Sequence, residues 1–347
     1  MTRLPIALFN YESGGLQPGG GYAFDPLQRV FAQIDAAPAL VLFCEAKHYR
    51  DRAGEAKYGA AEALSDQLGV RYVVELGSMA RGPMPPAIFY DPNVLVLRRW
   101  WNQDDPGAYD DQRNVARFAV RASGPVATHR TEFLAFVHHF EPLSGDVRLE
   151  EARRVSRYGA CQPLPVIGGG DLNATASGEH LPQRDWMAAD FGARSHKGMV
   201  GPDDEWGPDT RALDYLIGAW DEDSQQRRDG CGLYAVAEMA WRLDPTQPIL
   251  PTVNEKVDAG GALLIDWLLA NEAMREHVIP GSYKVHIPDE RYPRPSDHRL
   301  SRWRSSCRTA GSCPSYTSPE EDQDTTGGER RPLWRRPTPA TRSLEEL

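Results

Sequence analysis

The sequence has few cysteines, and their spacing fits neither a metal site nor a disulfide framework. Only five cysteines occur in 347 residues, and none forms a CxxC pair or a Cys/His spacing of the zinc type. Cys44 and Cys161 lie in or beside apolar runs, where a cysteine is usually a small buried hydrophobe. We therefore expect no structural zinc, and packing alone to stabilise a chain of this length.

Long apolar runs and an excess of positive charge are also missing. No stretch approaches the roughly 18 apolar residues of a membrane span, and the apolar run near the N-terminus is too short for a signal peptide. Lys and Arg number 39 against 49 Asp and Glu, a formal net charge of −10. This balance argues against a protein that binds nucleic acid through a generally basic surface. We expect a cytoplasmic protein without a membrane span.

The elements that are present are short and mixed in type. Apolar periodicity predicts strands at 4–10 and 39–44 and helices at 25–36 and 55–68. A series of short β-rich runs follows, at 71–75, 87–91, 94–99, 115–122 and 132–139. Later runs are helical at 149–158 and 233–243, with a brief strand at 165–167 and an apolar run at 261–270. Many short strands with several helices favour a layered α+β architecture over a doubly wound one.

The chain divides by composition into a catalytic domain and a tail. Residues 1–300 carry the apolar runs, and the stretch from about 177 to 258, rich in Asp, Gly, Pro and Trp, is interpreted as an insertion in the same domain. Residues 301–347 have almost no aliphatic side chains and no alternation, so we expect a disordered tail. The sequence indicates nothing about the oligomeric state.

Several predicted strands run into a polar residue of a catalytic type. These residues are Asn10, Glu45, His139, Asp171 with Asn173, Asp266, and Asp297 with His298. Strands that end together would bring these side chains into one cleft. Carboxylates, amides and imidazoles together indicate hydrolysis at a hard cation such as Mg²⁺, which prefers oxygen ligands and is often shared with a substrate phosphate.

In order and type, these motifs resemble the endonuclease/exonuclease/phosphatase family of Mg²⁺-dependent phosphoesterases. The matching pieces are Leu8-Phe9-Asn10, Phe43-Cys44-Glu45, Phe136-Val137-His138-His139-Phe140, Gly170-Asp171-Leu172-Asn173, Leu264-Ile265-Asp266-Trp267 and Ser296-Asp297-His298. The resemblance implies a DNase I-like fold, a four-layer α/β/β/α sandwich of two mainly antiparallel sheets flanked by helices. It also implies a phosphate-ester substrate and a bound Mg²⁺, with Mn²⁺ as an alternative ion.

The resemblance assigns a role to each site residue. Glu45 is the main metal ligand, assisted by Asn10 and Asp297. His298 is the general base that activates water, and Asp266 orients its ring. Three residues complete the set. His139 and Asn173 bind the substrate and stabilise the developing charge, and Asp171 either orients the neighbouring groups or donates a proton.

Two of these assignments have a competitor in the sequence. Asp214 lies in a similar sequence context to Asp266, but its surroundings predict a helix. His138 adjoins His139 and would point to the opposite face of the strand, so the motif register favours His139. The glycine-rich loop 14–21 is not followed by the helix start that a phosphate loop requires, so we expect a loop at the rim.

The substrate remains open at this level. The first hypothesis is a phosphodiesterase or endonuclease that uses water activated by His298 and Asp266. The alternatives are a phosphomonoesterase acting on a small or lipid-linked phosphate, and a catalytically silent member that binds a partner. Trp100 and Trp101, beside two arginines, keep nucleic acid among the partners to consider.

Overall fold

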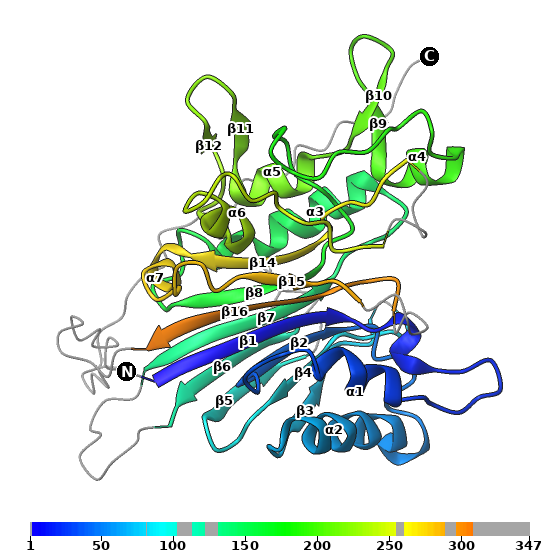
Figure 1. The fold of residues 1–347 in the computed structure, drawn as a ribbon, viewed down its shortest axis with the longest axis vertical. Coiled ribbons are helices and arrows are strands. Elements are labelled where there is room, and N and C mark those ends of the chain that lie inside the picture. Colours follow the sequence, from blue (N-terminus) through cyan, green and yellow to red (C-terminus); the bar gives the residue numbers. More distant parts are fainter. Residues whose placement is uncertain are drawn as a thin grey trace, which may run out of the picture. The chain divides into compact units, whose positions relative to one another are not determined.

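The computed structural model describes residues 2–80, 82–102, 113–121, 131–254, 260–288 and 296–307. They belong to one compact unit that extends from residue 1 to residue 311. Its framework is a pair of six-stranded sheets (Figure 1).

The first sheet has the strand order β15-β16-β1-β2-β4-β3. Its strands are β1 (Thr2–Asn10), β2 (Leu40–Cys44), β3 (Val73–Leu76), β4 (Ala87–Tyr90), β15 (Lys284–His286) and β16 (Leu300–Cys307). The second sheet has the order β13-β14-β8-β7-β6-β5. Its strands are β5 (Leu95–Trp101), β6 (Val115–Val120), β7 (Glu132–His139), β8 (Val166–Asp171), β13 (Leu233–Ala235) and β14 (Asp266–Asn271).

Helices and two small hairpins complete the described part. The α-helices are α1 (Asp25–Phe31), α2 (Glu55–Leu68), α3 (Gly145–Val155), α4 (Phe191–Lys197), α5 (Arg211–Ile217), α6 (Val236–Trp241) and α7 (Glu272–Arg275). The 3₁₀ turns are η1 (Glu12–Gly15), η2 (Arg52–Gly54) and η3 (Ser156–Tyr158). The hairpins pair β9 (Gly198–Val200) with β10 (Trp206–Pro208), and β11 (Ala219–Asp221) with β12 (Gln226–Arg228).

The core consists of three apolar layers between four structural layers. Side chains such as Leu42, Phe118 and Trp303 fill the space between the two sheets. A second layer joins the first sheet to α1 and α2, and a third joins the second sheet to α3 and α5. Figure 1 shows these helices on opposite sides of the sheets. The predicted four-layer α/β/β/α sandwich of mainly antiparallel sheets is confirmed.

The topology explains why polar residues collect at one edge of the sandwich. Each sheet contains one parallel pair, β1 with β2 and β7 with β8, and the other neighbours are antiparallel. The parallel strands end at the same edge, so Asn10, Glu45, His139 and Asp171 arrive there together. β14 and β16 run the opposite way and begin at that edge. Asp266 is therefore the first residue of its strand, which corrects the expectation of a strand that ends at this residue.

Several element boundaries differ from the predictions. The first helix ends at Phe31 instead of continuing to residue 36, and Asp35, beyond its end, forms ion pairs with Arg302 and Arg304 of β16. The strand expected at 165–167 continues through three glycines to Asp171. The helix expected at 233–243 is divided into β13 and α6.

The glycines of β8 are required by the close approach of the neighbouring strands. Gly170 has a φ of +140°, and a Cβ placed there would lie 1.7 Å from the carbonyl oxygen of His138. A side chain at this position would push β7 away from β8. The three glycines therefore allow His139 and Asp171 to end side by side.

Residues 301–307 correct the predicted start of the tail. We expect a disordered tail from residue 301, but Leu300–Cys307 form β16, which pairs with β1 on one side and β15 on the other. Trp303 is fully buried between the sheets, while small serines occupy other buried positions of the strand. Backbone pairing on both sides outweighs the poor β-pattern of this stretch. The rest of the predicted tail, 308–347, lies outside the described residues.

The segment expected to be an insertion, 177–258, is continuous with the sandwich in its described part. It contributes β13 to the edge of the second sheet, and α5 packs against α3. Among the helices that the structure describes, none has the length and apolar character needed to cross a membrane.

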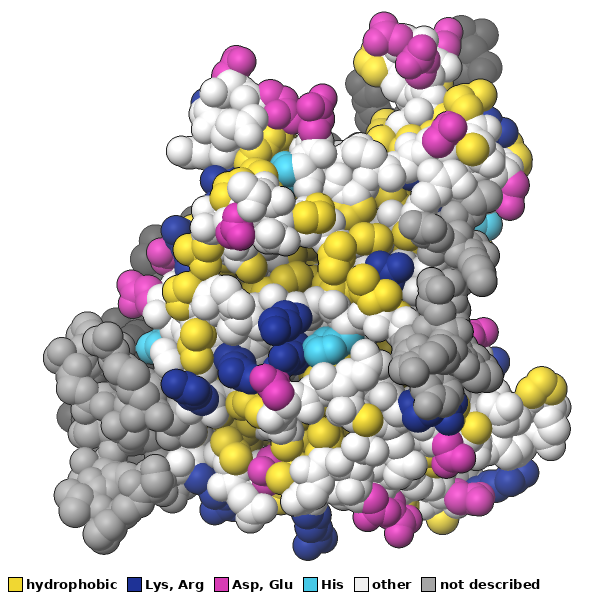
Figure 2. Space-filling view, in the orientation of Figure 1, with side chains coloured by type: hydrophobic (Ala, Val, Ile, Leu, Met, Phe, Trp, Pro, Cys, Tyr) yellow, Lys and Arg dark blue, Asp and Glu magenta, His cyan; other side chains and the backbone are white. Residues whose placement is uncertain are grey.

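The outer face of β15 and β16 is polar. Figure 2 shows basic side chains gathered in the middle of the face where these strands lie in Figure 1, with acidic and imidazole groups among them. The two strands carry Lys284, His286, Arg302 and Arg304, and Asp35 pairs with both arginines.

Candidate active site

Asn10 lies at the centre of the polar edge and contacts three other predicted site residues. Its Nδ2 donates to Glu45 Oε1 at 3.1 Å and to Asp171 Oδ2 at 3.0 Å, and it lies 3.4 Å from His298 Nε2. Asn10 is completely buried. Glu45, directly after β2, also accepts a hydrogen bond at 2.7 Å from the backbone N–H of Ser13. The two sheets therefore contribute to one cluster.

His298 and Asp266 form a buried pair. His298 Nδ1 donates to Asp266 Oδ2 at 2.7 Å, which leaves Nε2 facing Asp171 Oδ2 at 3.6 Å. Burial disfavours the imidazolium, but the charges of Asp266, Asp171 and Asp297 outweigh it and raise the pKa of His298 to about 10 in the protein without a metal ion. Burial raises the pKa of Asp266 despite the neighbouring imidazolium. The surrounding carboxylates thus stabilise a protonated ring.

Asp171 and His139 end adjacent strands and face the same cluster. His139 Nε2 lies 3.4 Å from Asp171 Oδ2. Burial opposes ionisation of Asp171, but nearby positive charges outweigh it and hold the pKa of the carboxyl below its usual value. These charges are, in order of effect, His298, His139 and Lys197. Asp171 is therefore a buried carboxylate whose ionised form is favoured by its neighbours.

Asn173 is held in a fixed orientation beside Asp171. Its backbone N–H donates to Asp171 Oδ1 at 2.9 Å, and its Nδ2 donates to the carbonyl oxygen of Phe140 at 3.0 Å. Its Oδ1 accepts a hydrogen bond from Lys197 Nζ. The hydrogen bond from the Asn173 N–H to Asp171 Oδ1 closes an Asx-type turn, which aligns both side chains with the site.

Asp297 lies at the open side of the cluster, together with an acidic residue that sequence reasoning missed. Asp297 Oδ1 is 4.0 Å from His298 Nε2 and accepts a hydrogen bond from the hydroxyl of Ser296 at 3.2 Å. The same hydroxyl accepts from the N–H of Glu12. Burial and the charges of Asp297 and Glu45 raise the pKa of Glu12. Glu12 closely follows Asn10, but only the fold shows that it faces Asp297.

This donor set fits a hard divalent cation. Asn10 Oδ1 is buried and has no hydrogen-bond partner among the described residues, although it lies beside the carboxylate of Glu45. The mutual repulsion of Glu12, Glu45 and Asp297 would be relieved by a cation. Two sets of side chains have ligand atoms within 4.8 Å of one another: Glu45, His139 and Asp171, and Asp171, Asp266 and His298. Asp297 belongs to neither set. The oxygen donors Asn10 and Glu45 suit Mg²⁺ best.

The backbone at Glu45 is strained and supported by a buried glycine. Glu45 has a φ of +64°, which is uncommon for a residue with a side chain. Gly14, in η1, has a φ of +63°, and a Cβ there would lie 2.7 Å from the carbonyl oxygen of Glu45. Gly14 and Gly15 are buried, so this part of the predicted rim loop is packed against the metal-ligand candidate.

The competing residues occupy other environments. His138 is buried on the opposite face of β7, where its ring contacts Phe136 and Phe140. Asp214 lies on α5, as its surroundings predict, and accepts hydrogen bonds from Ser177. Neither belongs to the cluster at the polar edge, whereas every predicted site residue lies at or beside it.

Solved structures share this fold at low sequence identity. No family model matches the sequence, and no curated protein matches it. An endonuclease/exonuclease/phosphatase protein of Bacteroides vulgatus aligns with a TM-score of 0.53 at 13% identity, covering 89% of this chain and 100% of that one. TDP2 of D. rerio, in complex with single-stranded DNA product, aligns with a TM-score of 0.51 at 14% identity, covering 88% and 100%. The chain has the endonuclease/exonuclease/phosphatase fold.

The endonuclease/exonuclease/phosphatase fold confirms the resemblance that the motifs indicate. At 13–14% identity the two neighbours establish the fold alone. The roles of individual residues therefore rest on the geometry of this chain.

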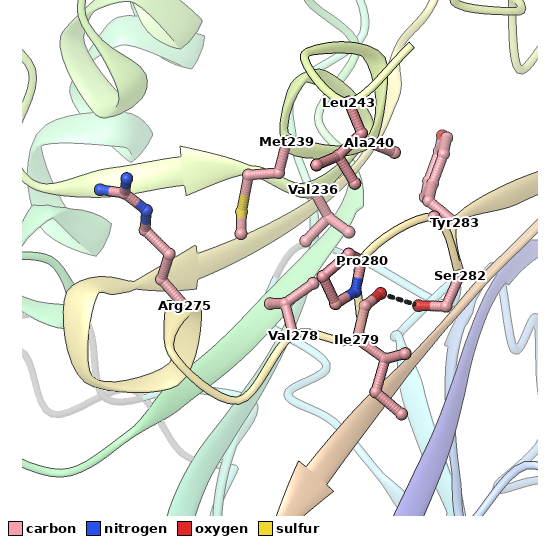
Figure 3. Close-up of a pocket in the computed structure, with 11 residues that line it drawn as sticks. Val236, Met239, Ala240, Leu243, Arg275, Val278, Ile279, Pro280, Ser282 and Tyr283 are labelled. Atoms are coloured by element: carbon pink, nitrogen blue, oxygen red, sulfur yellow. Dashed lines mark hydrogen bonds between the residues drawn. The ribbon is translucent and has the colours of Figure 1, made fainter.

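An apolar cavity lies apart from the polar cluster. It has a volume of about 170 Å³ and is lined by α6 and by residues 278–283 (Figure 3). Val236, Met239 and Ile279 contribute apolar side chains, and Arg275 follows the far end of β14. No predicted site residue lines this cavity.

Proposed function

We propose that the chain is a metal-dependent phosphoesterase that hydrolyses a phosphodiester. The observation that carries this proposal is the buried pair of His298 and Asp266, whose free ring nitrogen faces Asn10 and Asp171. A base, an orienting carboxylate and a set of oxygen donors are thereby present in one cluster, as hydrolysis by activated water requires.

His298 is the proposed general base. Its Nδ1 donates to Asp266, so Nε2 is the atom that would accept a proton from the attacking water. A bound cation would offset the carboxylate charges that raise the pKa of this ring, and would so favour the neutral form that a base requires. The imidazolium that results is stabilised by the carboxylates of Asp266 and Asp171. Asp266 acts by holding the ring and its tautomer rather than by taking up the proton.

Donors on the second sheet would stabilise the phosphoryl group. His139 and the amide of Asn173 are the proposed substrate-binding groups, and both are aligned by contacts with Asp171 or Phe140. Because these donors are positioned by the scaffold before the substrate binds, they need little reorganisation when negative charge develops. Asp171 orients these donors. Because its pKa is held below the usual value, it acts as an ionised carboxylate and not as the group that protonates the leaving oxygen.

Glu45 and Asn10 would hold the metal ion, with Asp297 at its open side. A bound Mg²⁺, or Mn²⁺ in its place, supplies charge neutralisation at the phosphate and at the leaving oxygen. The unpartnered Oδ1 of Asn10 supports this assignment.

Nucleic acid is the first natural substrate class to test. One structure with this fold, TDP2 of D. rerio, contains single-stranded DNA product. On this chain, Trp100 packs toward the space between the sheets, and Arg99 lies over the ring of Trp101 at 4.7 Å. A short DNA strand and a small diester should therefore be compared.

The proposal predicts metal-dependent cleavage that depends on Asp266. Purified protein should hydrolyse bis(p-nitrophenyl) phosphate in Mg²⁺ and lose this activity in EDTA. Asp266→Asn removes the carboxylate that orients His298, so kcat should fall by about 10²–10⁴-fold. Asp214→Asn is the matched control, because Asp214 is also largely buried but lies in another hydrogen-bond network. Rates are measured by release of p-nitrophenolate.

Three results would contradict this function. Equal rates for Asp266→Asn and wild type would contradict the proposed role of the His298–Asp266 pair. Activity that persists in EDTA would contradict the dependence on a metal ion. Cleavage of p-nitrophenyl phosphate without any cleavage of the diester would favour the phosphomonoesterase alternative.

A further inference from the structure

Lys197 brings a positive charge to the active-site edge from the segment expected to be an insertion. It is the last residue of α4, and its Nζ donates to Oδ1 of Asn173. The ammonium is half-buried and close enough to Asp171 to affect its ionisation. No motif in the sequence indicates Lys197. It lies 26 positions after Asp171, and only the fold brings it into contact with Asn173.

The backbone around Lys197 is anchored from the buried interior. Arg148 of α3, which is 1% exposed, donates to the carbonyl oxygen of His196 at 2.7 Å. The carbonyl oxygen of Lys197 accepts from the N–H of Asp209 at 3.0 Å, and Asp209 is held by two hydrogen bonds from Arg211. The backbone at Lys197 is therefore tied to two buried charged residues, Arg148 and Asp209.

The same arginine also fixes the chain that follows His139. Arg148 Nη1 donates to the carbonyl oxygens of Glu141 and Pro142, two and three residues beyond His139. One buried side chain thus sets the positions of the segments that carry His139 and Lys197. His139, Lys197 and Asn173 lie around the same buried carboxylate of Asp171.

We propose that Lys197 is a substrate-binding residue that contacts a non-bridging oxygen of the phosphoryl group. This inference rests on the phosphoesterase function proposed above. An ammonium has three donors, so Lys197 can hold the amide of Asn173 and an anionic oxygen at the same time. The charge-assisted contact strengthens as the phosphoryl oxygens gain charge in the transition state. The inserted segment therefore completes the phosphate site.

The experiment compares neutral replacements of Lys197 with a replacement on the same helix. Lys197→Met removes the charge, and Lys197→Gln removes the charge but keeps an amide that can donate to Asn173. Arg194→Met is the matched control, because Arg194 is on α4 and lies over the ring of Trp206 at 5.8 Å, away from Asn173. Circular dichroism confirms that each variant is folded, and Lys197→Gln decides the question if Lys197→Met does not fold.

Two readouts are measured on the full chain in Mg²⁺. We expect both Lys197 variants to lower kcat/KM for bis(p-nitrophenyl) phosphate by about 100-fold. Calorimetric titration with inorganic phosphate should show binding weakened by about tenfold, while Arg194→Met stays close to wild type in both measurements.

The two readouts separate this inference from the proposed function. If wild type cleaves neither ester, the proposed function fails, and phosphate binding alone still decides the role of Lys197. Weaker phosphate binding in the folded Lys197 variants supports the inference. Phosphate binding and kcat/KM equal to those of Arg194→Met would overturn it.

Discussion

At the scale of single residues, Asn10 and Glu45 show how a cation site is prepared by a buried amide and a strained carboxylate. The amide nitrogen of Asn10 joins Glu45 to Asp171, while its oxygen has no hydrogen-bond partner among the residues described. An unsatisfied buried oxygen costs free energy unless a ligand completes it. A metal ion is the ligand that the adjacent carboxylates favour.

Removing the charge of Glu45 should weaken metal binding strongly and leave the fold intact. In Glu45→Gln we expect Mg²⁺ and Mn²⁺ affinity to fall by at least about 100-fold, because the main anionic ligand is lost. Calorimetric titration of each ion measures this. Glu132→Gln, which changes a carboxylate paired with Arg117 at the start of β7, should bind as wild type does. An unchanged affinity in Glu45→Gln would place the metal on the other set, Asp171, Asp266 and His298.

At the scale of elements, η1 supports the ligand at the end of β2. Gly14 has a positive φ, and a Cβ there would meet the Glu45 carbonyl oxygen at 2.7 Å and the Tyr49 ring at 2.8 Å. We expect Gly14→Ala to lower the free energy of unfolding by about 1–3 kcal/mol and to weaken metal binding, because Glu45 must shift. Gly19→Ala is the control, since no atom lies within 4 Å of its Cβ position. The free energy of unfolding, measured by chemical denaturation, should equal that of wild type in Gly19→Ala and be lower in Gly14→Ala.

The pairing of β15 with β16 makes stability depend on pH through His286. Burial and the charges of Arg302 and Lys284 lower the pKa of His286 to about 4, and its Nε2 accepts a hydrogen bond from Arg302 Nε at 2.9 Å. The folded protein therefore holds the neutral ring while the unfolded chain protonates near pH 6.5. This stabilisation is complete above pH 6.5 and is lost as the pH falls toward 4.

Replacing His286 should remove that part of the pH dependence. The wild type should lose about 1–2 kcal/mol through this ring between pH 6.5 and 4, less than the full linkage value because solvent screens a half-buried group. His286→Gln keeps an acceptor for Arg302 but does not titrate. Urea denaturation at several pH values gives the free energy of unfolding of each protein as a function of pH. Identical slopes for wild type and His286→Gln would show that the ring titrates normally in the folded state.

At the scale of the whole molecule, β16 connects the beginning and the end of the described chain. It pairs with β1 and β15, and Trp303 fills the space between the sheets. A chain that ends at Leu300 would leave β15 without a strand partner, expose the edge of β1 and remove Trp303, so we expect little soluble protein and no cooperative thermal transition. A chain that ends at Gly311 keeps the strand and should unfold cooperatively. Equal melting temperatures for the two chains would show that β16 is dispensable.

Local sequence patterns were sufficient for the layered fold and for most of the proposed site. Asn10, Glu45, His139 and Asp171 end or directly follow strands predicted from apolar runs. His139 faces the cluster and His138 does not, because alternate residues of a strand point to opposite faces. Such features depend on neighbours in the chain, so they can be deduced from sequence.

What only the tertiary structure decided depends on contacts between distant segments. Lys197 reaches Asn173 through a network centred on Arg148, and Glu12 meets Asp297 across the two ends of the chain. β16 is a strand because β1 and β15 pair with it on both sides, not because its own residues favour one. By itself, the sequence determined which residue types lie at the ends of the apolar runs, since periodicity and turn chemistry are local. Which of these residues meet was decided by long-range packing and burial, which no local pattern records.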